Sequence, residues 1–404
     1  MSSQVTPSFL YPRLSAMMYF QYFTWGAFMV TMPTYFMANL KFSGEQVGLV
    51  YSTQAIAAMI TPVIIGMIAD RFFSTQKVAG ICHLSGAALL FTASQTPEFG
   101  FIYFLMLGFF LSTMPTVALT TSLTFRHIAY PERDYPRIRV WGTLGWMSAS
   151  ILVGTLKIED QNLPLMIGAV SGLLMGLYCF TLPDTPPQAK QHTFKIRDAI
   201  GLDALKLFRN LSFAALLIFA LILNIPRAFY LSFTNAFLNE IGMVNAAGKM
   251  SIGQLGEIFL LLLLPWFLKR FGIRKVILFA TIGWITRYLL FSFGNLDENA
   301  WMLYFGIALH GLCYVYFYLT AQIYVDQKAG PGMKAAAQGL LTFMTSGTGA
   351  FIGSIIAGYT VDANLVSEGI HDWQAIWLFP AYMAAFVFVG LFLFFRDDSE
   401  QEQA

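Results

Sequence analysis

The sequence predicts an all-α membrane protein with twelve transmembrane helices in two six-helix halves. Three observations lead to this prediction. Hydrophobic residues make up 57% of the 404 residues and charged residues only 11%, whereas a soluble protein carries about a quarter charged residues. The apolar residues form stretches that reach the length of about 20 residues needed to cross a bilayer. One long polar segment divides these stretches into two groups of six.

The apolar stretches are separated by short polar or basic segments, which give their ends to within a few residues. In chain order, the expected spans are 14–38, 45–68, 78–95, 100–125, 137–156, 163–182, 211–238, 248–268, 275–294, 301–324, 334–361 and 374–395.

The polar segment 183–210 is the expected boundary between the halves. It contains three prolines and five basic residues, and its part around 200–208 is amphipathic, as in helices that lie on a membrane surface. We therefore expect an N-terminal half over 1–182, a cytoplasmic linker over 183–210 and a C-terminal half over 211–404.

The basic residues predict the orientation, because Lys and Arg concentrate in cytoplasmic loops. With a cytoplasmic N-terminus, the outer loops contain only Lys41, Lys157 and Lys249, and the other loop bases fall inside. The start of the chain shows no signal-peptide cleavage pattern. We expect a multi-pass protein of the bacterial inner membrane with both termini in the cytoplasm.

The sequence gives no indication of nucleic-acid binding, metal binding or nucleotide-driven chemistry. A net charge of +2 gives no indication of nucleic-acid binding, and the three cysteines lie in apolar stretches without CxxC spacing, as small buried residues do. The glycines between Gly347 and Gly353 lie inside a span, where they favour close helix packing rather than phosphate binding. We expect no cofactor, no metal and no enzymatic activity, in a monomer surrounded by lipid.

Glu257 is the carboxylate placed deepest within a span, roughly 14 Å from the start of its helix. Gln254 lies one turn earlier on the same face. A carboxyl group there must face a wet cavity, meet a cation or stay protonated. Each possibility suits a substrate or proton site, although a purely structural role is the alternative.

The fifth span carries Arg139, Thr143 and Trp146 at i, i+4 and i+7, which places them on one stripe of a helix. Forked donors, a hydroxyl and a flat ring are groups that bind a ribose or a hexose. The alternative is that Arg139 extends to the cytoplasmic surface while Trp146 packs.

The tenth span carries His310 and Tyr314 at i and i+4. His310 is either a substrate contact or a core histidine. Arg287 is a candidate to pair with Glu257 or His310, and a structural ion pair is the equal alternative. Arg227 follows Pro226, where the helix is interrupted, and is a candidate for the cavity mouth. His83 is interpreted as a packing residue.

Distinctive groups of residues occur along nearly the whole chain. They include Phe20-Gln21, Trp25-Gly26, Ile81-Cys82-His83, 137–146, Gly201-Leu202-Asp203-Ala204, Ala337-Gln338-Gly339 and Gly369-Ile370-His371-Asp372-Trp373. With these groups, the chain resembles the nucleoside:proton symporter family of the major facilitator superfamily over nearly its whole length. The Asp70–Arg71 pair resembles the superfamily's motif between helices two and three, which implies a gating latch.

This resemblance implies the major facilitator fold and proton-driven uptake of nucleosides into the cytoplasm. By matching motif, it places the binding positions on Arg139, Thr143, Trp146, Gln254, Glu257, His310 and Tyr314. Family members carry an acidic residue just after the position of Tyr314, where this chain has Val315. Proton coupling is therefore expected at Glu257.

A more distant resemblance to lactose permease leaves a second substrate open. Its span-five pattern matches Arg139, Gly142, Gly145 and Trp146, and its intramembrane Arg and His align with Arg287 and His310. Its proton-carrying carboxylate aligns with Cys313, which cannot replace it. A proton-coupled or facilitative sugar transporter is thus the alternative to a nucleoside transporter.

Overall fold

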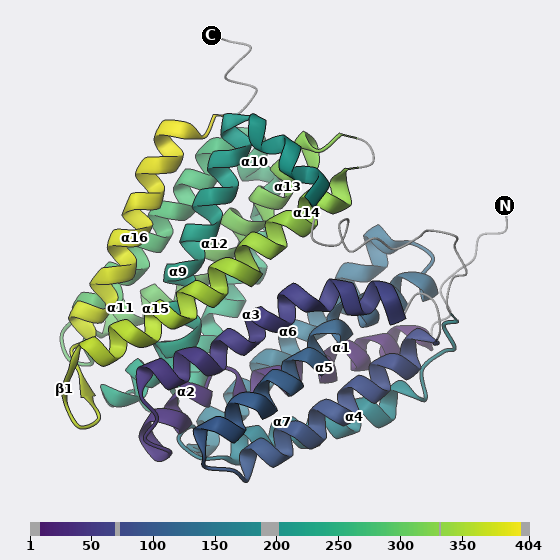
Figure 1. Cartoon of the computed structure of the whole chain (residues 1–404), viewed down its shortest axis with the longest axis horizontal. Coiled ribbons are helices and arrows are strands. Elements are labelled where there is room, and N and C mark those ends of the chain that lie inside the picture. The colour runs from purple at the N-terminus through teal and green to yellow at the C-terminus, as the bar shows by residue number, and fades with distance from the viewer. Residues whose placement is uncertain (1–8, 69–72, 187–201, 331–332, 397–404) are drawn as a thin grey trace. The chain divides into compact units, whose positions relative to one another are not determined.

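The computed structural model describes residues 9–68, 73–186, 202–330 and 333–396, and most of them lie in helices (Figure 1). Within these ranges, each of the twelve expected spans falls on helix, so the predicted helical spans are confirmed. Seven described helical stretches are long and apolar enough to cross a membrane, judged by length and composition alone. One short β-hairpin, Leu365–Ser367 (β1) with Ile370–His371 (β2), was not predicted.

The chain divides into two compact units whose border runs through a helix. One unit comprises Met1–Lys41 and Ile56–Phe194, and the other comprises Phe42–Ala55 and Lys195–Ala404. Helix α3 (Gly44–Ile68) therefore contributes its first residues to the C-terminal unit.

Helix α1 lies at the centre of the packing in the N-terminal unit, where it contacts both α6 and α7, while α4 packs against α5 and α7. The expected first span is interrupted, because α1 ends at Phe28 and a short helix and a π-helical turn follow. The helices of this unit are α1 (Leu10–Phe28), α2 (Met32–Thr34), η1 (Tyr35–Asn39), α4 (Thr75–Ser94), α5 (Phe99–His127), α6 (Pro131–Leu156) and α7 (Leu163–Cys179).

In the C-terminal unit, a short 3-10 helix lies where the sequence predicts an amphipathic piece. Helix α10 packs against α11, α12 and α16, and α9 packs against α15 and α16. The helices are η2 (Leu202–Arg209), α9 (Leu211–Glu240), α10 (Ala246–Phe293), α11 (Ala300–Ala308), α12 (His310–Tyr314), η3 (Val315–Leu319), α13 (Thr320–Lys328), α14 (Lys334–Thr342), η4 (Phe343–Gly349), α15 (Ala350–Ala363) and α16 (Trp373–Phe394).

Glycines decide two features of this unit. Gly272 has φ 75° and ψ 169°, a conformation that glycine adopts readily, and there α10 separates into the expected eighth and ninth spans. At Gly349 a Cβ would lie 2.6 Å from the carbonyl oxygen of Leu221, and at Gly353 it would lie 2.8 Å from that of Asn224. The predicted close packing at these two glycines is thus confirmed, and it brings η4 and α15 against α9.

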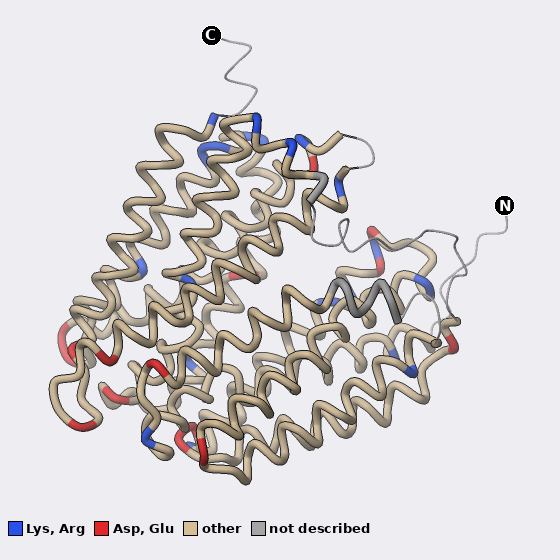
Figure 2. The backbone as a smooth tube through the Cα atoms, viewed as in Figure 1, with Lys and Arg blue, Asp and Glu red and all other residues tan. Residues whose placement is uncertain are grey.

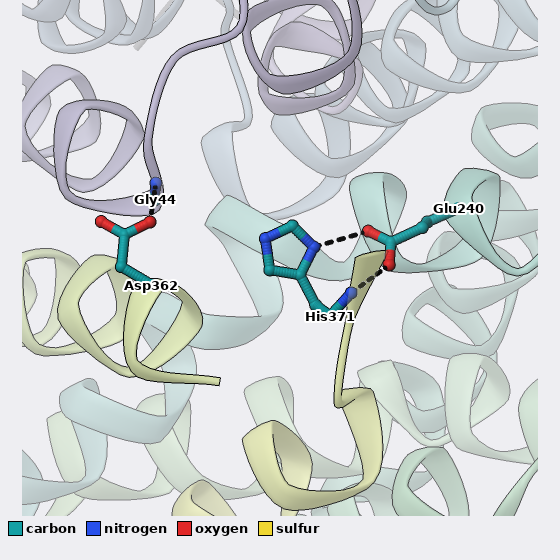
Figure 3. A network of polar contacts seen from close by, with 4 residues as sticks. All are labelled: Gly44, Glu240, Asp362 and His371. Atoms are coloured by element: carbon teal, nitrogen blue, oxygen red, sulfur yellow. Dashed lines mark hydrogen bonds and ion pairs between the residues drawn. The ribbon is translucent and has the colours of Figure 1, made fainter. Parts of the chain in front are cut away.

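Two carboxylates tie the elements of the C-terminal unit together near the hairpin (Figure 3). Asp362 accepts hydrogen bonds from the backbone N–H groups of Gly44 at 2.6 Å and Glu45 at 2.8 Å. A carboxylate suits this place, because the first N–H groups of a helix have no partner within the helix. Glu240, the last residue of α9, accepts from the backbone N–H of His371 at 2.7 Å and lies 2.8 Å from its Nδ1 atom.

The charged residues of the C-terminal unit separate toward its two ends (Figure 2). In Figure 2, Lys and Arg gather at the end of the unit where α16 finishes, whereas Asp and Glu gather toward the end that carries the hairpin. Such a separation is typical of membrane proteins whose basic ends face the cytoplasm.

Candidate functional site

The polar centre of the C-terminal unit forms where α10 and α12 approach each other closely. A Cβ at Gly311 would lie 2.5 Å from the backbone nitrogen of Glu257, and one at Gly253 would lie 2.8 Å from Cβ of His310. Because these two positions are glycines, the backbones come near enough for the side chains of Glu257 and His310 to meet. His310 Nε2 lies 3.9 Å from Glu257 Oε2.

The Glu257–His310 pair is partly accessible, with 32% of the Glu257 side chain and 15% of the His310 side chain exposed. A carboxylate beside an imidazole is a pair that can exchange protons and hydrogen-bond a ligand. When the Gln254 amide is oriented so that its nitrogen faces the backbone, it donates to the carbonyl oxygens of Met250, at 2.8 Å, and Ser251, at 3.2 Å. The side chain is half-buried on the face that also carries Glu257.

Aromatic rings surround His310. Its ring stacks on Tyr314, with 5.9 Å between centroids and 5° between planes, and on Tyr230, with 5.1 Å and 22°. Tyr314 is 38% exposed, whereas Tyr230 is buried. Such stacked faces suit a planar nucleobase.

Arg287 forms neither of the expected ion pairs in the described part of the chain. Its side chain is fully buried, its Nε donates to the carbonyl oxygen of Gly306 at 3.1 Å, and its guanidinium lies 4.1 Å from the ring centroid of Tyr230. The expectation of a direct pair with Glu257 or His310 is therefore wrong. The helix rotation presents Arg287 to a backbone carbonyl and a ring instead.

The predicted stripe of the N-terminal unit lies on α6. Arg139, Thr143 and Trp146 are all half-buried, and the Arg139 guanidinium stacks 4.1 Å from the ring centroid of Tyr22 on α1. A Cβ at Gly26 would lie 2.6 Å from the Trp146 carbonyl oxygen, so α1 holds the Trp146 backbone closely. Among the described residues, the buried Trp146 Nε1 has no hydrogen-bond partner.

The predicted residues thus form two separate sets. Arg139, Thr143 and Trp146 share one face of α6 in the N-terminal unit. The structure brings the other four together in the C-terminal unit, on α10 and α12. The predicted gating pair, Asp70 and Arg71, lies outside the described residues.

Other expectations are corrected by contacts between helices. His83 is buried, as expected of a packing residue, but its Nε2 also lies 2.8 Å from Gln21 Oε1, so it has a polar partner. Cys179 and Cys313 are buried, whereas Cys82 is only half-buried, and all three are free thiols.

Tyr22 and Tyr230 were missed by sequence reasoning. Each is one of many aromatic residues in an apolar span, and no spacing distinguishes them. The sequence does show that Arg139 and Arg287 lie within spans and need partners on other helices. It does not show which residues are those partners, because the pairing depends on how the helices are rotated.

The membrane helices, with ionisable side chains at the centre of one unit and a polar stripe in the other, define a secondary transporter of the major facilitator class. The chain belongs to the nucleoside H+ symporter family, whose model matches residues 10–400. This result confirms the predicted family.

Relatives are similar in sequence to this chain over nearly its whole length. The putative nucleoside transporter YegT of Escherichia coli (strain K12) is 40% identical, over 96% of this chain and 94% of its own. The xanthosine permease of the same organism is 34% identical, over 97% of each chain. Two crystal structures of the nucleoside transporter NupG, one of them a mutant, superpose with TM-scores of 0.90 and 0.92 at 30% identity. They cover 96% of this chain and 99% and 100% of theirs, so the predicted twelve-helix fold is confirmed.

Proposed function

We propose that this chain imports nucleosides into the cytoplasm by proton symport, through alternating access of a central site. The observation that carries the proposal is a family match over residues 10–400 together with a carboxylate beside an imidazole inside the membrane helices. A transporter that uses the proton gradient needs one group that gains and loses a proton within the membrane. Glu257 is in the position to serve as that group.

The roles of the other residues follow from their chemistry. Arg139 and Thr143 donate to ribose hydroxyls, and Trp146 stacks on the sugar or base. Gln254, His310 and Tyr314 complete the set with an amide, an imidazole and an exposed ring. Asp70 and Arg71 are proposed as a gating latch on the grounds of their motif.

The proposed organisation is an N-terminal half over 1–182, a linker over 183–210 and a C-terminal half over 211–404. The protein acts as a monomer in the inner membrane, in contact with lipid and without nucleic acid. Both termini lie in the cytoplasm, an assignment supported by the crowding of Lys and Arg in alternate loops.

Uptake of labelled uridine into cells that express the chain tests the function. We expect accumulation above the external concentration, accompanied by alkalinisation of the medium and abolished by a protonophore. Excess unlabelled nucleosides should compete and hexoses should not. Accumulation of a sugar without any nucleoside uptake would contradict the proposal.

Reporter fusions test the orientation. A reporter placed after Ala404 and another placed within the linker 183–210 should both give a cytoplasmic signal, because the basic loops are retained on that side. A third fusion in the hairpin, after Glu368, is the matched control and should report the periplasm. A periplasmic signal from either of the first two fusions overturns the assignment.

A further inference from the structure

The expected seventh and ninth spans each carry one arginine, Arg227 on α9 and Arg287 on α10, apart from the bases at the α10 break. Among the described residues, neither is within ion-pair distance of a carboxylate, and the polar centre contains one acid, Glu257. The negative charge of Glu257 can compensate the positive charge of only one of the two guanidinium groups. The positive charge of the other guanidinium group then remains without compensation.

Arg227 is held in place by side-chain and backbone contacts. Its Nη1 donates to Asn224 Oδ1 at 3.1 Å, and the buried Asn224 amide in turn donates to the Ala220 carbonyl at 2.8 Å. Tyr288 donates to the carbonyl oxygen of Pro226 at 2.5 Å, which fixes the backbone just before the arginine. The guanidinium is therefore positioned rather than free to extend toward water.

The position of Arg227 connects it to the proposed site. Its guanidinium lies 5.7 Å from the ring centroid of Tyr314 and 5.6 Å from that of Tyr318. Tyr314 stacks on His310, which meets Glu257. Arg227 is half-buried, whereas Arg287 is fully buried behind the ring of Tyr230. Of the two arginines, Arg227 is thus the one that a ligand stacked on Tyr314 can reach.

Polar atoms without partners surround this place. Arg287 Nη1 and Nη2, the hydroxyl groups of Tyr230 and Tyr318, and His310 Nδ1 are buried and have no hydrogen-bond partner in the described part of the chain. Contact with aromatic rings offsets only part of the cost of burying a guanidinium. A negatively charged ligand beside Arg227 would offset, through its field, positive charge that no second carboxylate of the described polar centre compensates.

We propose that Arg227 is a specificity-determining residue that favours nucleosides whose base is an anion, such as purine-2,6-dione nucleosides. The proposal rests on the proposed function, because it names the substrate class of the same site. The flat base stacks on Tyr314, and the exocyclic oxygens of the base accept hydrogen bonds from the guanidinium, which presents donors in a planar fork.

Xanthosine and guanosine form a matched pair of probes. They share the ribose and the purine frame, but xanthosine has an oxygen at position 2 where guanosine has an amino group. With that oxygen, the xanthine base loses a ring proton near neutral pH, whereas guanine stays neutral. Measured without a membrane potential, the ratio of their KM values therefore isolates the charge of the base.

The test compares the KM for both probes in proteoliposomes, below and above the pKa of xanthosine. In the unaltered protein, the preference for xanthosine over guanosine should increase as pH rises. In Arg227→Gln, the KM for xanthosine should rise about 10- to 100-fold more than that for guanosine, the effect of losing a hydrogen bond to a charged group. The pH dependence of the preference should also disappear, and Arg227→Lys should restore it in part.

Arg209→Gln, on the exposed η2 helix, is the matched control and should leave both KM values unchanged. The contrary result is that Arg227→Gln reduces guanosine and xanthosine uptake equally and abolishes proton movement. That result would show that Arg227 acts on the protonation of Glu257 rather than on the base, and it would overturn the proposal. Unchanged selectivity would also overturn it. If the unaltered protein transports no nucleoside, the proposed function itself fails, a result distinct from transport without charge preference.

Discussion

Replacing Glu257 by glutamine is expected to abolish accumulation of nucleosides against a gradient. Glutamine keeps the shape of the side chain and much of its hydrogen bonding, but it cannot gain or lose a proton. The described polar centre has no second carboxylate near His310, since the position after Tyr314 is Val315. The measurement is substrate-driven alkalinisation of the medium, recorded together with the uptake of labelled uridine.

Exchange of nucleosides across the membrane without accumulation should survive in Glu257→Gln, because the amide still binds hydroxyl groups. This residual exchange shows that the variant is folded. Glu298→Gln, at an exposed loop position, is the control and should behave as the unaltered protein. Undiminished proton uptake in Glu257→Gln would exclude Glu257 as the carrier.

Replacing Trp146 by alanine should weaken nucleoside binding by roughly 1–3 kcal/mol, the range found for base–aromatic stacking. That loss corresponds to about a 5- to 150-fold rise in the dissociation constant. Since Gly26 contacts the Trp146 backbone rather than its ring, the path of α6 should remain. Trp146→Phe keeps a flat ring and should retain much of the affinity.

Trp141→Ala is the control for this series, because Trp141 lies on the same helix and is 45% exposed. Binding to the detergent-solubilised protein, measured beside its thermal unfolding, separates lost stacking from lost structure. If alanine and phenylalanine at position 146 reduce affinity equally in folded protein, Trp146 is a packing residue and the stripe has no role in binding.

The fold class could be predicted because it depends on local composition. An apolar stretch of sufficient length must form a helix in lipid, where every backbone group needs a partner within the segment. The spans and the spacing of Arg139, Thr143 and Trp146 on one helix face both follow from the order of residues along the chain.

The partners of the buried polar groups were decided only by the tertiary structure. Arg287 was expected to meet a carboxylate or a histidine, but it meets the Gly306 carbonyl and the ring of Tyr230. His83 had no partner visible in the sequence and lies beside Gln21. Glu257 and His310 meet because glycines at 253 and 311 let two helices approach closely. Which face one helix turns toward another depends on such contacts between distant residues, and hydrophobic periodicity within one span does not contain that information.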